Sequence, residues 1–264
     1  RKTLNCFTLP TGGGKSAIMC SLAADYIKQG YNVLYITLEL SEDMISTRID
    51  VNITNTTLDE IDKIELQEYV RRCDVGYRGT GKIIVREFPT SVVNTSAITA
   101  LINELKQKQN FIPDVLFVDY INLIQPVRKT DNKSYTIVKY TAEEIRGICV
   151  QNNMVGITAT QVNREGVKNN EIEVTDVSES FGLPATVDFM CGGFSTEAQR
   201  ENNLVFMKVT KNRYSGHVNT KFMLKLDFSK MKLEDIPIED EKQAERDGVV
   251  NGITTGTVRT RPMR

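Results

Sequence analysis

The stretch Gly12-Gly13-Gly14-Lys15-Ser16 decides the fold of this chain. An apolar run from Leu4 to Leu9 precedes it, and an apolar segment with helical character begins at Ala17. A strand, a glycine turn, Lys-Ser and a helix occur in this order in phosphate-binding loops. Glycines allow consecutive backbone N–H groups to converge on an anion, and the helix N-terminus adds its dipole. We therefore predict a nucleotide site made by Thr11, Gly12, Gly13, Gly14, Lys15, Ser16 and Ala17.

Two side chains of this loop have separate roles in the prediction. Lys15 is expected to reach the β- and γ-phosphates, and the Ser16 hydroxyl is expected to be a ligand of Mg²⁺. The general pattern has a glycine five positions before Gly14, whereas this chain has Leu9 there. The alternative interpretation is a glycine turn that only joins a strand to a helix, with Lys15 in solvent.

The composition is that of a globular protein, and it excludes several kinds of site. The 264 residues are 40% hydrophobic and 25% charged, enough for one large domain or two small ones. A net charge of −1 gives no overall basic field, so any nucleic-acid binding has to use local patches. The single histidine, His217, excludes a multi-histidine metal site. The five scattered cysteines form no C-x-x-C pair, which favours free thiols in a reducing, cytoplasmic environment.

Strand and helix patterns alternate along the chain, which indicates a mainly parallel, twisted sheet with helices on both faces. Apolar runs predict strands at 4–9, 33–38, 82–88, 115–121, 154–160, 189–194 and 204–210. Helices are expected at 15–29 with Gly30 as its cap, after the N-cap Ser41, and at 58–72, 96–109 and 135–151. Residues 222–228 and 230–233 are expected to close the sheet as an antiparallel pair.

The chain is expected to form one domain over residues 1–237, followed by a polar, flexible tail over 238–264. Residue 1 is an arginine, and the first strand begins almost at once. We therefore also expect the chain to be a fragment that lacks an upstream domain.

Three polar residues end predicted parallel strands, whose carboxyl ends meet at one edge of the sheet. Asp119 is placed like the acid that holds the Mg²⁺ shell in phosphate-loop proteins. Glu39 is placed where a carboxylate can orient or deprotonate the attacking water. Gln161 is placed where its amide can contact the γ-phosphate. The alternatives are a strand that happens to end in Asp, a capping or solvated Glu, and a terminal Gln without a role.

Lys211 and Arg213 follow the predicted strand at 204–210. A Lys-x-Arg pair at a strand end can extend to the γ-phosphate of a neighbouring subunit, as an arginine finger does. The alternative is an ordinary basic hairpin turn.

Two polar segments that follow sheet strands carry cations that can contact a phosphodiester chain. They contain Arg128 and Lys129 in one segment and Arg164 and Lys168 in the other. No aromatic residue is interleaved with them, which favours contact with the DNA backbone over stacking on bases. Each segment taken alone is also consistent with a solvated loop.

Together these residues resemble the RecA-like C-terminal motor domain of DnaB-type hexameric replicative DNA helicases, in particular the helicases of T-even-type phages. The resemblance extends from about Thr3 to about Leu233. It includes Cys20-Ser21-Leu22-Ala23-Ala24-Asp25-Tyr26, Asn32-Val33-Leu34-Tyr35-Ile36, Val118-Asp119-Tyr120 and Ser180-Phe181-Gly182-Leu183-Pro184-Ala185-Thr186-Val187-Asp188-Phe189-Met190. It implies an α/β fold, a RecA-like P-loop NTPase whose mainly parallel sheet has an antiparallel C-terminal edge.

The resemblance also implies a role for each residue of the predicted site. Lys15 and Ser16 bind the phosphates and Mg²⁺ of ATP or another nucleoside triphosphate. Glu39 is the general base, Asp119 is the second magnesium ligand and Gln161 is the γ-phosphate sensor.

The same resemblance implies an assembly. Lys211 and Arg213 are donated in trans to the ATP of the adjacent subunit of a homo-hexamer, and the segments after Asp119 and Gln161 are pore loops that hold single-stranded DNA. The resemblance also implies movement along DNA from 5′ to 3′. It implies a primase and a helicase loader as partners. In the family an N-terminal collar and a linker helix help to build the ring, so we expect the chain alone to form rings poorly.

Two other functions remain open at this point. A RecA-like recombinase or recombination mediator has the same loop, acids and sheet but forms open filaments rather than rings. A nucleotide-dependent switch or loading module binds nucleotide without unwinding DNA. A guanine-specific switch is disfavoured, because the sequence contains no Asn-Lys-x-Asp motif.

Overall fold

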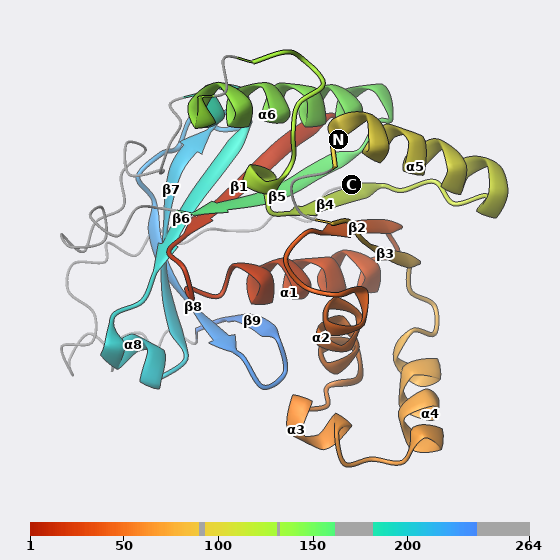
Figure 1. The fold of residues 1–264 in the computed structure, drawn as a ribbon. Coiled ribbons are helices and arrows are strands. Elements are labelled where there is room, and N and C mark those ends of the chain that lie inside the picture. The colour runs from red at the N-terminus through yellow and green to blue at the C-terminus, as the bar shows by residue number, and fades with distance from the viewer. Residues whose placement is uncertain (90–92, 131–132, 162–181, 237–264) are drawn as a thin grey trace.

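The computed structural model describes residues 1–89, 93–130, 133–161 and 182–236. The strands of these residues form one sheet in the order β3-β2-β4-β5-β1-β6-β7-β8-β9. From β3 to β6 in this order the neighbours are parallel, and β7, β8 and β9 continue the sheet antiparallel. The predicted parallel sheet with an antiparallel C-terminal edge is therefore confirmed (Figure 1).

The strands coincide with the apolar runs of the sequence to within a few residues. Their bounds are β1 Thr3–Leu9, β2 Val33–Thr37, β3 Ile83–Glu87, β4 Val115–Asp119, β5 Val155–Gln161, β6 Phe189–Phe194, β7 Leu204–Asn212, β8 Lys221–Asp227 and β9 Lys232–Asp235. The predicted strand at 115–121 is shorter than expected, because the chain leaves the sheet after Asp119 and makes a 3₁₀ turn over Ile121–Leu123.

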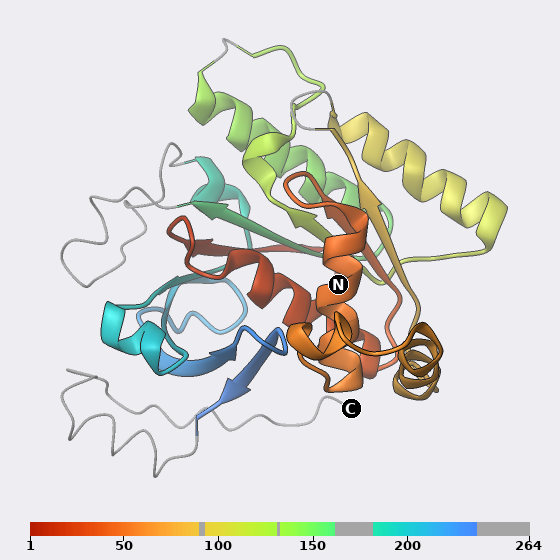
Figure 2. The same ribbon diagram turned by 60° about the horizontal axis from the view of Figure 1, so that its bottom comes forward.

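The helices lie on both faces of the parallel strands. Figure 1 shows α5 and α6 on one face and α1 and α2 on the other, and Figure 2 shows the second pair from below. The bounds are α1 Lys15–Lys28, α2 Glu42–Thr54, α3 Leu58–Ile61, α4 Leu66–Gly76, α5 Thr95–Gln109, α6 Ser134–Gln151, α7 Gly182–Thr186 and α8 Glu197–Glu201.

The central strands are apolar throughout because both of their faces are buried. In β2, Leu34 and Ile36 belong to the core under α5 and α6, whereas Val33 and Tyr35 belong to the core under α1 and α2. All four side chains are fully buried. This double coverage leaves the ends of the strands as the places where polar groups can lie.

Local signals set several helix ends as predicted. The Ser41 hydroxyl accepts a hydrogen bond from the Met44 N–H at 3.2 Å and caps α2. Gly30 follows α1 with a φ of 88°, a left-handed conformation that glycine adopts without strain.

The single helix expected at 58–72 is wrong in one respect, because the structure has two helices there. The Thr57 hydroxyl and the Glu60 carboxylate form a capping box that starts the short helix α3. The chain then turns, and α4 begins at Leu66. The hydroxyls of Tyr69 and Tyr77 donate to Asp50 of α2, so α4 is anchored to a neighbouring helix rather than continuing α3.

Residues 237–264 lie outside the described part of the chain, so the division into a domain at 1–237 and a tail at 238–264 stays a prediction. Within the described ranges, no helix combines the length and apolar character that crossing a membrane requires.

Asp188, the residue before β6, joins three elements at the amino edge of the parallel strands. Its buried carboxylate accepts the Leu4 N–H at 3.0 Å and pairs with Arg146 of α6 and with Arg213 after β7, both at 3.0 Å. Burial alone raises the pKa of Asp188, but the hydrogen bonds from Arg146, Leu4 and Arg213 outweigh it and lower the pKa below its ordinary value. The charged carboxylate therefore stabilises the fold.

Asp188→Asn should lower the free energy of unfolding at pH 7 by about 1–3 kcal/mol, because both guanidinium groups lose their charged partner. Since folding lowers the pKa of Asp188, this stabilisation is present above the ordinary pKa of 3.8 and is lost as the pH falls through the folded value. Urea unfolding should show the difference from the parent narrowing in acid. Glu104→Gln, which breaks an exposed pair with Lys108, is the control and should change little. Equal stability of the two variants at pH 7 would contradict a stabilising role for the Asp188 carboxylate.

Candidate functional site

The carboxyl ends of parallel strands bring the predicted nucleotide residues to one edge of the sheet. The glycine loop follows β1, Glu39 comes two residues after β2, Asp119 ends β4 and Gln161 ends β5. In the sheet, Gln161 lies opposite Leu9, and Asp119 lies opposite Thr37. A cleft opens here, and its lining includes the glycine loop, Glu39, Arg48, Gln161 and Phe228.

The glycine loop leads into α1 through Gly14, the N-cap residue of that helix. Gly14 has a φ of 88°, and a Cβ atom there would lie 2.7 Å from Leu226 Cδ2, so only glycine fits. None of the described side chains caps the helix N-terminus. The first backbone N–H groups of this 14-residue helix are therefore free of a side-chain acceptor and suited to an anion.

Lys15 is a buried cation at the start of α1. It is 8% exposed, and its ammonium lies 5.6 Å from the centre of the Tyr120 ring. Burial lowers the pKa of Lys15, and the negative charges of Glu39 and Asp119 partly offset this effect. A phosphate that entered the cleft would supply the opposite charge at close range.

Asp119 is a buried carboxylate, 1% exposed, at the end of β4. The Tyr35 hydroxyl donates to its Oδ2 at 2.9 Å, whereas its Oδ1 has no hydrogen-bond partner among the described residues. Burial raises the pKa of Asp119, while the hydroxyls of Tyr35 and Ser16 and the charge of Lys15 act in the opposite direction. Oδ1 of Asp119 is therefore a buried carboxylate oxygen that receives no hydrogen bond from the described residues.

These donors fit Mg²⁺ carried by a nucleotide. Mg²⁺ prefers hard oxygen ligands and is usually held by one or two carboxylates together with substrate phosphates and water. The Asp119 carboxylate and the Ser16 hydroxyl are oxygen donors beside the cleft. Among the described residues no cluster of three His, Cys, Asp or Glu side chains could hold a metal ion alone, so phosphates would complete the shell.

Glu39 is exposed and lines the cleft from the loop between β2 and α2. Its negative charge acts to raise the pKa of both Lys15 and Asp119, so the three charged groups interact across the cleft edge. Arg48 of α2 lines the same cleft and was missed in the sequence. The sequence does contain one indication of its position. Arg48 immediately precedes the buried Ile49, so its charged side chain lies beside the buried face of α2.

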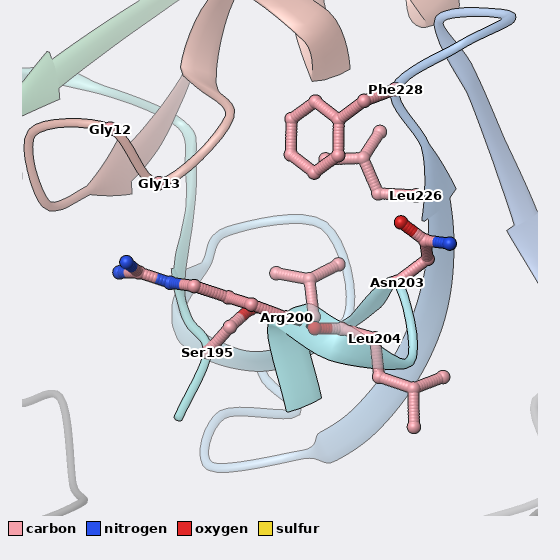
Figure 3. A pocket seen from close by; sticks show the side chains of 9 residues that line it. Gly12, Gly13, Ser195, Arg200, Asn203, Leu204, Leu226 and Phe228 are labelled. Atoms are coloured by element: carbon pink, nitrogen blue, oxygen red, sulfur yellow. Dashed lines mark hydrogen bonds between the residues drawn. The ribbon is translucent and has the colours of Figure 1, made fainter. Parts of the chain in front are cut away.

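A second cavity borders the glycine loop, and its lining includes Gly12, Gly13, Arg200, Leu226 and Phe228. Figure 3 shows the Arg200 side chain extending toward the glycine loop, with the Phe228 ring and Leu226 across the cavity. Phe228, which is 42% exposed, lines both this cavity and the main cleft. No sequence motif marks Arg200 or Phe228, because each belongs to a different element and only the fold unites them.

Lys211 and Arg213 lie at the opposite edge of the sheet from the glycine loop. Phe189 pairs both with Asn5, near the start of β1, and with Asn212, near the end of β7. Arg213 is held there by Asp188 and by the Ala185 carbonyl at 2.8 Å, and Lys211 donates to the carbonyls of Pro184 and Ala185. The pair is therefore remote from the cleft of its own chain.

The candidate DNA-binding residues are only partly described. Arg128 pairs with Glu143 at 2.9 Å and lies over the Tyr140 ring, so its charge is already engaged. Lys129 is exposed. Arg164 and Lys168 lie outside the described residues.

Comparison with known proteins gives consistent matches. The family described as the DnaB-like helicase C terminal domain matches residues 4–232. A DnaB-like replicative helicase of Enterobacteria phage T4 is 38% identical over 218 residues, 80% of this chain and 46% of that protein. The chain thus spans about half the length of this curated relative.

Two solved structures share the fold. One is the structure of a DnaB-like replicative helicase and its interactions with primase, with a TM-score of 0.73 and 15% identity over 90% of this chain and 58% of that one. The other is the structure of an ATPase domain, with a TM-score of 0.73 and 14% identity over 89% of this chain and 85% of that one. Because the family match covers most of the residues that build the sheet and the cleft, the chain belongs to the DnaB-like helicase C-terminal domain family.

Proposed function

We propose that the chain is the ATP-driven motor of a replicative DNA helicase. It hydrolyses ATP, or another nucleoside triphosphate, with Mg²⁺, moves along single-stranded DNA and unwinds duplex at a replication fork. The observation that carries the proposal is the meeting of Lys15, Glu39 and Asp119 beside an uncapped helix N-terminus. Family membership favours this function over the recombinase and the switch that the sequence left open.

Each residue of the cleft has a task in this proposal. The loop N–H groups and Lys15 bind the phosphates, and Ser16 and Asp119 hold Mg²⁺. Mg²⁺, when bound, draws charge from the phosphoryl oxygens. Glu39 orients the attacking water and accepts its proton, and Gln161 contacts the γ-phosphate.

We further propose that the nucleotide base occupies the cavity between Phe228 and Arg200. An aromatic ring and a guanidinium plane both stack on bases of any sequence, with an added cation–π attraction from arginine. The cavity adjoins Gly12 and Gly13, so a base there would be continuous with phosphates held at the loop.

The separation of Arg213 from its own cleft supports donation to a neighbouring subunit. An arginine at one edge and a nucleotide site at the opposite edge of the sheet suit a head-to-tail contact, which closes into a ring when the rotation fits. A homo-hexamer with ATP at its subunit interfaces meets this requirement. Asp188 fixes the guanidinium from within its own subunit.

The remaining parts of the proposal concern DNA and partners. Lys129, with Arg164 and Lys168, contacts the DNA backbone, and Arg128 takes part if it leaves Glu143. Movement from 5′ to 3′, a helicase loader, a primase and a cytoplasmic location follow from the family resemblance. One structure with the same fold concerns a helicase that interacts with primase, which supports that partner.

Lys15→Ala should abolish binding of labelled ATP, because the phosphates lose their buried cation. Glu39→Gln should bind ATP normally but hydrolyse it about 10²–10⁴-fold more slowly, with strand displacement lost in parallel. ATP binding, phosphate release with and without single-stranded DNA, and strand displacement are measured on the same preparations. Lys28→Ala, at the far end of α1, is the control. Near-normal ATP binding by Lys15→Ala would contradict the phosphate site, and parent-like hydrolysis by Glu39→Gln would leave Glu39 as a capping residue.

Phe228→Ala should weaken ATP binding about 5- to 150-fold, the range that corresponds to the loss of one aromatic stack of about 1–3 kcal/mol. Inorganic tripolyphosphate has no base, so its affinity should not change. Competition against a fluorescent nucleotide measures both. If both ligands lose affinity equally, Phe228 supports the loop and not the base. If neither does, the base lies elsewhere.

Arg213→Ala subunits should bind ATP but lose about 10³-fold or more in turnover, because the transition-state charge in the adjacent subunit is unmatched. Lys15→Ala subunits keep an intact Arg213. Because rings are expected to need the full-length protein, the two variants are made and mixed in that form. Mixing should restore ATPase activity at interfaces that combine an intact glycine loop with an intact Arg213. Native mass spectrometry verifies that mixed rings form. Mixed rings without activity, or full activity of Arg213→Ala alone, would contradict the trans assignment.

A further inference from the structure

A hydrogen bond buried between β2 and β4 joins the phenol of Tyr35 to the carboxylate of Asp119. The hydroxyl donates to Oδ2 at 2.9 Å, and Tyr35 is fully buried. β2 and β4 are parallel neighbours in which Tyr35 lies opposite Phe117 and Thr37 lies opposite Asp119. Side chains two residues apart share a face of a sheet, so the phenol and the acid lie on the same face.

The position of the Tyr35 hydroxyl is fixed by its surroundings. The ring stacks on Phe117, with centroids 5.5 Å apart and planes 7° from parallel. The Cys20 thiol of α1 also lies beside the phenol. Cys20 comes one helical turn after Ser16, whose hydroxyl interacts with Asp119, so the same face of α1 packs against both the phenol and the acid.

The Asp119 carboxylate is therefore asymmetric. Tyr35 occupies Oδ2, whereas Oδ1 has no hydrogen-bond partner in the described part of the chain. A carboxylate whose one oxygen is held by a fixed donor cannot rotate freely about its last side-chain bond. The free oxygen then keeps one direction before any ligand arrives.

We propose that Tyr35 is a positioning residue that holds Asp119 so that Oδ1 is presented to the metal ion of a bound metal–nucleotide complex. The inference rests on the proposed function in one respect, namely that Asp119 serves a metal-bound nucleotide. Nothing in the phosphate-binding pattern assigns a role to Tyr35, which lies inside an apolar strand.

A purely structural role for the hydroxyl makes a different prediction. A buried phenol needs an acceptor, and Asp119 could serve only to satisfy it. In that case removal of the hydroxyl changes stability at every metal concentration alike. If the hydroxyl positions Asp119, its removal changes the dependence of nucleotide binding on metal concentration, because the direction of Oδ1 matters only for binding the metal ion.

The test uses Tyr35→Phe, which removes one oxygen and keeps the ring that stacks on Phe117. Tyr26→Phe is the matched control: Tyr26 packs edge-on against the same Phe117 ring, with centroids 6.2 Å apart, and its variant leaves the Asp119 hydrogen bond intact. Binding of a fluorescent ATP analogue is measured in EDTA and across a Mg²⁺ titration. Mn²⁺ binding to the protein–nucleotide complex is followed by electron paramagnetic resonance.

Tyr35→Phe should match the parent in EDTA but need about 10-fold more Mg²⁺ for half-maximal enhancement of binding, with a similar loss for Mn²⁺. Tyr26→Phe should behave as the parent. A parent-like metal dependence of Tyr35→Phe would overturn the inference, and so would an equal loss in EDTA and in Mg²⁺. If the parent itself shows no metal-dependent nucleotide binding, the proposed function fails, and this result is distinct from the other two.

A double-variant cycle gives a second, independent readout. If Tyr35 acts through Asp119, then Tyr35→Phe should have no further effect on metal dependence in an Asp119→Asn background. An additive loss in the double variant would show that Tyr35 acts by another route and would overturn the inference.

Discussion

The burial of Lys15 and Asp119 at one edge of the sheet is the constraint on which the rest of the structure depends. Burial disfavours the charged form of each, lowering the pKa of the lysine and raising that of the aspartate. The charge of each group partly offsets the pKa shift that burial causes in the other. Asp119 Oδ1 still lacks a hydrogen-bond partner among the described residues. A phosphate and a divalent cation would supply what each group lacks. The fold therefore holds its polar groups in place before the ligand arrives, which is what electrostatic stabilisation of a reaction requires.

In the proposed function, the two edges of the sheet have separate tasks. The carboxyl ends of β1, β2, β4 and β5 collect the proposed nucleotide-binding residues, and the amino edge holds Arg213 on the buried Asp188 carboxylate. The antiparallel strands connect them: β7 carries the chain to Arg213 at one edge, and β8 ends just before Phe228 beside the glycine loop at the other. In a head-to-tail ring the two edges of adjacent subunits would complete one site, so hydrolysis in one subunit would depend on the position of the next.

The core of the site could be predicted from the sequence because each residue directly follows an apolar run. The glycine loop, Glu39, Asp119 and Gln161 all end buried strands, and a parallel sheet gathers such ends without further information. Phe228 and Tyr35 could not be found in this way. Phe228 gains its place only from the packing of β8 beside the loop, and Tyr35 looks like any aromatic residue in an apolar strand. The break between α3 and α4 could not be predicted for a similar reason. The hydrogen bonds from Tyr69 and Tyr77 to Asp50 of α2 are tertiary contacts, and the spacing of apolar residues does not reveal them.

A crystal structure of the protein with an ATP analogue and Mn²⁺, with anomalous diffraction measured at the manganese edge, tests the proposed nucleotide site most directly. The proposed site requires an anomalous peak beside Asp119 Oδ1 and the Ser16 hydroxyl, with the phosphates against the glycine loop and the base against Phe228. A peak elsewhere, or a nucleotide bound at the Arg213 edge of the same subunit, would contradict it.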